Sequence, residues 1–322
     1  MKLLVTGGLG FIGSNFIEYW FKKHSRDTII NLDKVTYAAD QQNLIGIEKY
    51  DYTFVKGDIS NLKTVFELSK NVDTIINFAA ESHVDNSILN SSNFVKSNII
   101  GVHNLLEAVR KYGTRFHQVS TDEVYGSLPL NSKLKFSEKS RYDPRNPYSA
   151  TKAAADHLVN AYFNTYKLPV TISNCSNNYG PNQHPEKLIP KTIINAVREV
   201  PIPVYGNGLQ IRDWIYVEDH CSALELIIKR GTYGETYLVS ANTEKHNIDV
   251  IKSILRKLNK SEELINFVND RPGHDVRYAI DARKIIKELG WRSKIKFDDG
   301  LNLTINHYLK NLYCYSKKAM VI

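Results

Sequence analysis

The sequence predicts an α/β fold in which a doubly wound parallel sheet is joined to a smaller mixed α/β domain. Short apolar segments alternate with helical patterns through the first half of the chain, which is typical of parallel sheets covered by helices. The first apolar segment runs into a glycine-rich turn at residues 7–13, which opens a helical pattern. An acidic residue, Asp33, follows the second apolar segment about twenty residues beyond that turn.

The strands of this sheet are expected where short runs are almost wholly apolar, because such strands are buried on both faces. Five such runs lie in the first half, at residues 2–6, 28–32, 52–55, 73–80 and 116–119. Helical patterns lie between them at 14–21, 62–69 and 93–112. Since ligands of these sheets bind at the carboxyl ends of the strands, the residues that follow each strand are candidates for a site.

The pattern changes after a further strand at 168–173. Polar, turn-rich residues follow, and the expected elements beyond them are helices opening at 187–190 and covering 219–229 and 248–258, with strands at 214–217 and 235–239. We therefore expect one domain at 1–175, to which 214–242 returns. The second domain is expected to consist of 176–213 and 243–322.

The glycine-rich turn has the spacing Gly-x-x-Gly-x-x-Gly, formed by Gly7, Gly10 and Gly13. Glycines here permit a tight turn and let the backbone approach a pyrophosphate at the helix N-terminus. Asp33 is placed to hold the adenosine ribose diol, and its charge would repel the 2′-phosphate of NADP. The nearby Lys34 weakens that repulsion. The first domain is therefore expected to be a Rossmann-type domain that binds NAD.

Two adjacent carboxylates, Asp122 and Glu123, come directly after the strand at 116–119. Tyr148 and Lys152 open the next helical pattern, and their i, i+4 spacing places phenol and ammonium on one helical face. A lysine charge favours the phenolate, which can act as a base, and a carboxylate pair can divide acid and base work. Alone, the two carboxylates would indicate only a helix start, where acidic residues are stabilising.

The composition suits one large or two closely joined globular domains: the chain has 322 residues, of which 42% are hydrophobic. The formal net charge of +8 could suggest a nucleic-acid or acidic-lipid partner. However, the lysines are scattered in short groups and form no run long enough for a nucleic-acid groove. We expect no nucleic-acid or membrane partner, while a basic pocket for a phosphorylated small molecule stays open.

Metal, disulfide and export signals are also weak. Cys175, Cys221 and Cys314 lie far apart, so neither a disulfide framework nor a zinc site is expected. His83 has no partner at metal spacing and is expected to hydrogen-bond locally. The N-terminus lacks the apolar run of a signal peptide, and no run approaches the ~20 residues of a membrane helix. We therefore expect a cytoplasmic protein with a loose tail at 317–322.

Longer motifs carry a family resemblance. They are Ala79-Ala80-Glu81-Ser82-His83-Val84-Asp85, Thr121-Asp122-Glu123-Val124-Tyr125-Gly126, Asn177-Asn178-Tyr179-Gly180-Pro181, Pro185-Glu186-Lys187-Leu188-Ile189-Pro190 and Asp270-Arg271-Pro272-Gly273-His274-Asp275. From residue 1 to roughly 300 the chain resembles the dTDP-glucose 4,6-dehydratase family of the extended short-chain dehydrogenase/reductase superfamily. The related epimerases carry small or neutral residues at the Asp-Glu pair, and GDP-mannose dehydratases lack its Asp. The pair therefore favours a dTDP-glucose dehydratase.

The resemblance implies a mechanism that suits these residue types. Tyr148 would take the proton of the C4 hydroxyl while hydride passes to NAD, giving a 4-ketone that acidifies the C5 proton. Glu123 would remove that proton, and Asp122 would protonate the C6 hydroxyl so that water leaves. Hydride would then return to C6. This division of labour requires Asp122 to be protonated while Glu123 is ionised, so their surroundings must separate the two pKa values.

The resemblance and the positions at strand ends also imply the ligand contacts. Thr121 and Lys152 join the catalytic group. The expected cofactor contacts are Gly7, Gly10, Phe11, Ile12, Gly13, Asp33, Lys34, Thr36, Asp58, Ile59, Phe78, Ala79, Ala80, Ser82, Ser97, Tyr148, Lys152 and Asn178. The expected substrate contacts are Ser82, Thr121, Asn177, Lys187, Leu188, Pro203, Tyr205, Arg212, Asn247, Arg271 and His274. Arg212 and Arg271 would grip phosphate and Tyr205 would stack on a base. Singly, Arg212 could instead pair with Asp213 and Tyr205 could belong to the core.

Alternatives stay open at this point. A UDP-glucose 4,6-dehydratase or a sugar-nucleotide 4-epimerase would share the scaffold, and the nucleotide base is not readable from the residues. A regulatory NAD-binding protein that lost its chemistry is a further alternative, against which the four intact catalytic groups count. Helices at 93–112 and 148–166 carry an apolar surplus, and in this family such helices pair across a homodimer.

Overall fold

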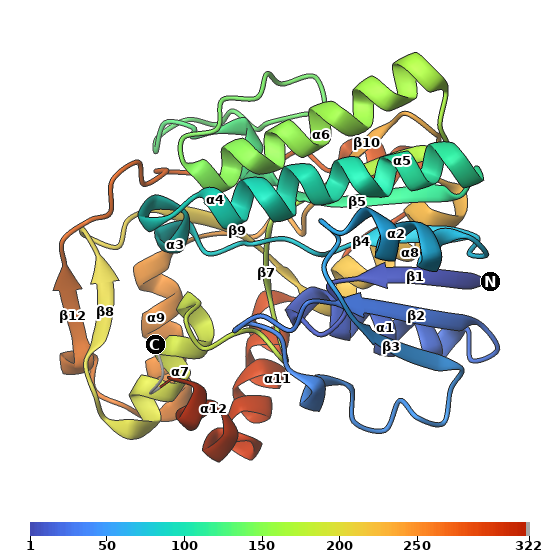
Figure 1. Ribbon diagram of the computed structural model, residues 1–322. Coiled ribbons are helices and arrows are strands. Elements are labelled where there is room, and N and C mark those ends of the chain that lie inside the picture. The colour runs from blue at the N-terminus through green and yellow to red at the C-terminus, as the bar shows by residue number, and fades with distance from the viewer. Residues whose placement is uncertain (320–322) are drawn as a thin grey trace.

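A seven-stranded sheet, parallel throughout, forms the centre of the computed structural model, which describes residues 1–319 (Figure 1). Its strands are β1 (Lys2–Thr6), β2 (Thr28–Asp33), β3 (Tyr52–Lys56), β4 (Thr74–Asn77), β5 (Arg115–Thr121), β6 (Val170–Cys175) and β10 (Thr236–Val239). They lie in the order β10-β6-β5-β4-β1-β2-β3. The order reverses between β1 and β4, which places a cleft at their carboxyl ends.

Helices cover both faces of this sheet, as the predicted fold class requires. One face packs against α1 (Phe11–Lys23) and α8 (Val217–Arg230), and the other against α2 (Leu62–Ser69), α5 (Val102–Tyr112) and α6 (Pro147–Tyr166). Leu3 and Val5 of β1 join the first apolar core while Leu4 joins the second, since successive strand residues face opposite sides. Figure 1 shows α5 and α6 side by side along the sheet.

A smaller mixed region completes the chain. Its three-stranded sheet has the order β11 (Glu244–His246), β9 (Ile211–Tyr216), β7 (Asn177–Tyr179), and its two-stranded sheet pairs β8 (Ile202–Tyr205) with β12 (Ile265–Val268). The helices here are α7 (Leu188–Arg198), α9 (Asn247–Leu258), α10 (Arg283–Leu289), α11 (Phe297–Lys310) and α12 (Leu312–Ala319). An aromatic core of Tyr179, Trp214, Tyr216 and Phe297 lies where β7, β9 and α11 meet. The division into one domain at 1–175 with 214–242, and a second at 176–213 with 243–322, stays a prediction.

The predicted helix at 93–112 is three successive segments: α4 (Ser92–Phe94), a π-helix at Val95–Gly101, and α5. A π-helical turn holds one residue more than an α-helical turn, so it changes which side chains face inward. Ser97 and Asn98, which are consecutive, are both buried. Asn98 donates from Nδ2 to Thr151 Oγ1 and Glu81 O, and accepts at Oδ1 from the backbone N–H of Glu81. The short helix α3 (Val84–Leu89) precedes these segments.

Two further details differ from expectation. The strand predicted at 168–173 begins at Val170, because Pro169 has no N–H to give to a sheet ladder. The tail expected at 317–322 is helical at 317–319 in α12, and residues 320–322 lie outside the described residues. Through residue 319, no helix has the length and apolarity needed to cross a bilayer.

Candidate active site

The glycine turn after β1 has a separate steric reason for each glycine. Gly7 has a φ of +70°, and a Cβ there would lie 2.6 Å from the backbone nitrogen of Ala79. A Cβ on Gly13 would lie 2.4 Å from the carbonyl oxygen of Gly7. A Cβ on Gly10 would meet only that oxygen, at 3.4 Å. Contacts within the protein therefore exclude a side chain at Gly7 and Gly13. At Gly10 the protein leaves room for a Cβ, and the absence of a side chain keeps the adjoining part of the cavity open.

Gly10 is the N-cap of α1, and no side chain caps this helix end. The first turn of α1 carries no acidic residue either. Backbone N–H groups at an uncapped N-terminus, together with the helix dipole, favour a bound anion. This end of α1 therefore suits the pyrophosphate of a dinucleotide.

Asp33 ends β2 with its side chain buried. Its two oxygens accept hydrogen bonds from the backbone N–H groups of Leu9, at 3.0 Å, and Val35, at 2.8 Å. Burial nevertheless raises the pKa of this carboxyl group. Lys34 does not face Asp33: its Nζ lies 3.0 Å from the carboxylate of Asp58. The lysine that weakened the prediction of NAD is thus paired with another acid.

All eighteen residues predicted to contact the cofactor line one cavity of about 320 Å³, a size usual for small-ligand sites. They are Gly7, Gly10, Phe11, Ile12, Gly13, Asp33, Lys34, Thr36, Asp58, Ile59, Phe78, Ala79, Ala80, Ser82, Ser97, Tyr148, Lys152 and Asn178. The predicted catalytic residues Thr121, Asp122 and Glu123 line the same cavity. The sheet's carboxyl edge therefore brings both groups together.

The two carboxylates lie in a short 3₁₀ helix, η3 (Asp122–Tyr125), which follows β5 directly. Thr121 is its N-cap and accepts a hydrogen bond at Oγ1 from the backbone N–H of Glu123, at 3.3 Å. The stabilising helix start considered above is thus present, and the same turn directs both acids into the cavity. Asp122 Oδ2 is buried without a hydrogen-bond partner among residues 1–319.

The two carboxyl groups have different electrostatic surroundings. Burial raises the pKa of Asp122 well above its ordinary value, and the charges of Glu123 and Asp213 raise it further. Burial also raises the pKa of Glu123, but three cations oppose the rise. They are Arg271, Lys187 and Arg212. Asp122 is thereby favoured as the acid of the pair and Glu123 as the base.

Tyr148 and Lys152 are positioned by the start of α6, which is strongly specified. Asn146 forms a capping box with Ser149, and a proline occupies the first helical position. Lys152 Nζ donates to the carbonyl oxygen of Val119, at 2.8 Å. Burial lowers the pKa of Lys152, whereas burial and the charge of Glu123 raise that of Tyr148 well above its ordinary value. Burial therefore opposes the charged forms of both side chains.

The predicted substrate residues divide into two sets. Ser82, Thr121, Asn177 and Lys187 line the cavity. Leu188, Pro203, Tyr205, Arg212, Asn247, Arg271 and His274 do not. Those of the second set belong to α7, β8, β9, α9 and the segment at 270–275, all in the smaller region.

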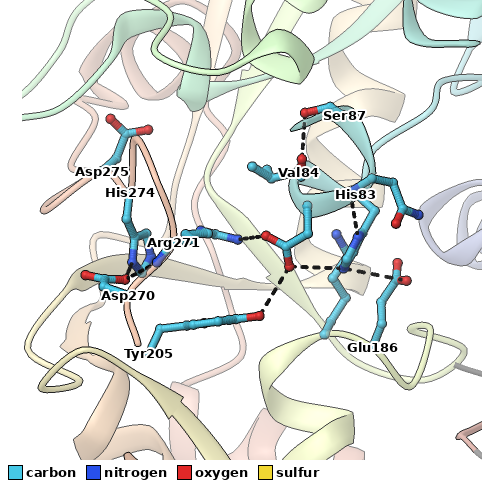
Figure 2. A network of polar contacts seen from close by, with 12 residues as sticks. His83, Val84, Ser87, Glu186, Tyr205, Asp270, Arg271, His274 and Asp275 are labelled. Carbon is cyan, nitrogen blue, oxygen red and sulfur yellow. Dashed lines mark hydrogen bonds and ion pairs between the residues drawn. The ribbon is translucent and has the colours of Figure 1, made fainter. Parts of the chain in front are cut away.

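Three of the second set lie in a polar network that reaches back to the first domain (Figure 2). The carboxylate of Asp85, on α3, lies 3.5 Å from Arg271 Nη1 and accepts a hydrogen bond from the Tyr205 hydroxyl at 3.3 Å. His274 Nδ1 lies 2.6 Å from Asp270 Oδ1. His83 accepts the predicted local hydrogen bond at Nδ1 from the backbone N–H of Asn86, at 3.4 Å. Its Nε2 also lies 3.7 Å from the carboxylate of Glu186. These contacts join segments 83–85, 186–205 and 270–274.

Arg212 is buried and does not form the local ion pair with Asp213 that the sequence left open. Its Nη2 donates to the carbonyl oxygen of Asp275, at 2.9 Å, and its guanidinium lies 4.4 Å from the ring centre of Tyr278. Asp213 instead accepts from Ser240 Oγ and from the backbone N–H of Thr243. Arg212 thus keeps part of its hydrogen-bonding capacity uncommitted.

Several residues that line the cavity were not predicted. Cys175, Ser176, Gln183, His184 and Glu186 are among them. Two of these are next to predicted residues, since Ser176 precedes Asn177 and Glu186 precedes Lys187. Their place in the turn-rich segment after β6 was the signal that could have identified them.

The chain matches proteins of known family along almost its whole length. The family model described as GDP-mannose 4,6 dehydratase matches residues 4–304. A dTDP-glucose 4,6-dehydratase of Haemophilus influenzae is 48% identical, and the match covers 97% of this chain and 98% of that protein. A protein of the same description from Mycobacterium tuberculosis is 46% identical over 97% of this chain and 94% of its own.

Solved structures agree. The dTDP-glucose 4,6-dehydratase DesIV of Streptomyces venezuelae, with NAD and TYD bound, is 40% identical, with a TM-score of 0.96 over 99% of this chain and all of that one. The Bacillus anthracis dTDP-glucose 4,6-dehydratase in complex with NAD is 43% identical, with a TM-score of 0.92, and the match covers 99% of each chain. A UDP-glucose 4-epimerase of Thermus thermophilus shares only 26% identity. Its TM-score is 0.88, and the match covers 96% of this chain and 99% of that one.

The parallel sheet, the glycine turn and the Tyr-x-x-x-Lys pair define a dinucleotide-dependent enzyme of the short-chain dehydrogenase/reductase class. The extent and identity of the matches are specific within that class. The chain belongs to the dTDP-glucose 4,6-dehydratase family.

Proposed function

We propose that this protein is an NAD-dependent lyase that converts dTDP-glucose to dTDP-4-keto-6-deoxyglucose, a step of deoxysugar nucleotide biosynthesis. One observation carries the proposal. Asp122 and Glu123 line the same cavity as Tyr148 and Lys152, and their surroundings favour an acid at the first position and a base at the second. An epimerase needs no such acid and base pair for water loss.

NAD would lie in the cavity with its pyrophosphate at the N-terminus of α1, where Gly10 leaves room, and its adenosine ribose at Asp33. The chemistry that NAD supplies when bound is reversible transfer of a hydride. Lys152 would hold the nicotinamide ribose from the floor of the cavity. The remaining cavity-lining residues predicted for the cofactor would complete its contacts.

The side chains of the protein would divide the proton transfers among them. Tyr148 accepts the proton of the C4 hydroxyl as that carbon becomes a ketone, with the ammonium of Lys152 favouring the phenolate. Glu123 removes the C5 proton that the ketone has acidified. Asp122 gives its proton to the C6 hydroxyl, which leaves as water. Glu123 can finally return a proton to C5 when C6 is reduced.

The sugar would lie beside Ser82, Thr121 and Asn177, with Lys187 toward the diphosphate. The residues of the smaller region would hold the nucleotide. Arg212 and Arg271 would bind the diphosphate, and Tyr205 would stack on the base. Polar groups nearby would contact His274 and Asn247, and the apolar surface of the nucleotide would contact Leu188 and Pro203. Two of them, Arg271 and Tyr205, contact Asp85 on α3, and His274 contacts Asp270 beside Arg271, which supports this assignment.

The alternatives weighed from the sequence receive less support. The matches with identities above 40% are to dTDP-glucose dehydratases, whereas the UDP-glucose 4-epimerase is 26% identical. We also propose a homodimer in which α5 and α6 pair with their copies, in keeping with two exposed apolar residues, Ile100 of the π-helix that precedes α5 and Tyr166 of α6. A cytoplasmic location suits a nucleotide-sugar substrate.

One assay tests the proposal. The protein with NAD is incubated separately with dTDP-glucose, UDP-glucose and GDP-mannose, and products are analysed for a 4-keto-6-deoxy sugar. We expect that product from dTDP-glucose, and none from a Tyr148→Phe variant that retains NAD. No product from any of the three sugars would contradict a dehydratase, and faster turnover of UDP-glucose would contradict the substrate.

A further inference from the structure

Asp156 is a buried acid that the proposed chemistry leaves unused. It lies one turn beyond Lys152 on α6, and its exposed fraction is 0%. Its Oδ2 accepts hydrogen bonds from Ser120 Oγ at 2.7 Å, Asn174 Nδ2 at 3.0 Å and Tyr142 OH at 3.2 Å. Its Oδ1 has no hydrogen-bond partner among residues 1–319. A carboxylate buried in this way is costly unless a nearby charge compensates it.

The hydrogen bonds around Asp156 converge on three consecutive residues at the end of β5. Lys152 Nζ donates to Val119 O, and Ser120 Oγ donates to Asp156. Asn174 Nδ2 donates both to Asp156 and to the carbonyl oxygen of Thr121, at 3.1 Å. Residues 119–121 are therefore tied to α6 and β6 immediately before the catalytic turn.

The charge of Asp156 is also complementary to that of Lys152. The i, i+4 spacing places both on one face of α6, and both are buried there. Burial lowers the pKa of Lys152, and the carboxylate of Asp156 raises it. Cys175 also faces Lys152, but its pKa is raised by burial to about 12, so the thiol is neutral at working pH.

The other titratable groups near Asp156 are uncharged at working pH as well. Tyr142, from the loop before α6, and Tyr125, from η3, both face the carboxylate. Burial and the charge of Asp156 raise both phenol pKa values far above the ordinary one. Burial raises the pKa of Asp156 itself, and the charge of Lys152 and the three hydrogen bonds oppose that rise. Asp156 is therefore the carboxyl group of this cluster that can compensate the Lys152 ammonium.

We propose that Asp156 is a positioning residue of the active site, which anchors the end of β5 under the catalytic turn and supplies the counter-charge of the Lys152 ammonium. The inference deepens the proposed function and rests on it. It explains why α6 carries a buried acid one turn beyond Lys152.

The test is Asp156→Asn, which keeps the shape and removes the charge. Single-turnover oxidation at C4 is followed as NADH absorbance on mixing the NAD-bound enzyme with dTDP-glucose, across pH. This step needs Lys152 as an ammonium, and loss of the Asp156 charge lowers the pKa of that ammonium. The alkaline limb of the pH–rate profile should therefore move to lower pH by about one unit in D156N. We expect the rate at neutral pH to fall about tenfold.

Tyr142→Phe is the matched control, since it removes one hydrogen bond to the same carboxylate and keeps the charge. Its alkaline limb should stay at the wild-type position. If D156N does not fold, Asp156→Ser removes the same charge with a smaller side chain and should give the same displacement.

A folded Asp156 variant whose alkaline limb stays at the wild-type position overturns the inference, even if its rate is low, because a purely structural role would not move that limb. A limb equally displaced in Y142F overturns it as well. Wild-type enzyme that forms neither NADH nor product from dTDP-glucose contradicts the proposed function and the inference together. Normal wild-type turnover with an undisplaced D156N limb contradicts the inference alone.

Discussion

Asp122 and Glu123 are adjacent in η3, yet distant elements bring an acid, Asp213, to the first and a cation, Arg271, to the second. The anion of Asp213, on β9, raises the pKa of Asp122, and the cation of Arg271 lowers that of Glu123. Burial raises the pKa of Asp213 itself to about 6, so this carboxyl group acts on Asp122 as an anion chiefly above that pH. Burial raises the pKa of both acids, and charges from the smaller region then change the two values in different directions.

Asp122→Asn separates the chemical steps. The amide cannot protonate the C6 hydroxyl, so we expect overall turnover to fall by about 10²- to 10⁴-fold. Oxidation at C4 depends on Tyr148 and should remain largely intact. The measurement is NADH absorbance in a single turnover, beside the yield of the 4-keto-6-deoxy product. Equal loss of NADH formation and product would show that the assignment of Asp122 is wrong.

Arg271→Gln should change the pH dependence of the base. Removing one cation that lowers the pKa of Glu123 raises that pKa, so the acid limb of kcat should move to higher pH by about half a unit. The measurement is kcat at saturating dTDP-glucose, because weaker substrate binding also follows from the loss of this arginine.

The control for this variant is Arg283→Gln, which removes an exposed cation paired with Asp281. Its acid limb should coincide with that of the wild type. An unmoved limb in Arg271→Gln would mean that the charge of Arg271 does not reach Glu123.

The glycines of the turn give a matched pair of variants. Gly10→Ala adds a Cβ that meets no protein atom closer than 3.4 Å, so thermal unfolding should change little while NAD affinity falls about tenfold. Gly13→Ala places its Cβ 2.4 Å from Gly7 O, and we expect a loss of stability of about 1–3 kcal/mol. Calorimetric NAD titration and thermal melts check both. Normal NAD binding by G10A would exclude a pyrophosphate beside that glycine.

Glu225 of α8 forms hydrogen bonds with Tyr19 and Lys23 of α1, and its contribution to stability should depend on pH. Although burial opposes it, hydrogen bonds from Tyr19, His24, Lys23 and Lys229 lower its pKa to about 2. Because the folded pKa lies below the ordinary 4.5, the contribution is complete above pH 4.5 and is lost as pH falls through about 2.

Glu225→Gln should therefore lower the free energy of unfolding by about 1–2 kcal/mol at pH 7, allowing for solvent screening. The difference from wild type should shrink between pH 4.5 and 2. Urea unfolding across this range measures it. Glu199→Gln, at an exposed carboxylate that pairs with Lys260, should change little at any pH. A pH-independent difference in Glu225→Gln would contradict the linkage.

Local pattern predicted most of the sheet and the cofactor side of the site. β1 and α2 have the predicted bounds because an apolar run and an amphipathic period define them. The acid at the end of β2 and the two acids after β5 follow from where these strands end. Contacts between distant segments could not be predicted in this way. Asp85 meets Arg271 across 186 positions, and no periodicity relates them. The π-helix was missed because the apolar spacing of 93–112 also fits an uninterrupted α-helix.

That π-helix has a consequence for how this helix tolerates change. The extra residue in its wide turn lets consecutive side chains serve two purposes: Ser97 faces the cavity, and Asn98 fastens Glu81 to Thr151. Deleting one residue from 95–101 would restore ordinary helical phasing and rotate the preceding segment by about 100° relative to α5. One of the two side chains would then leave its position. The positions of both side chains therefore depend on this one-residue insertion.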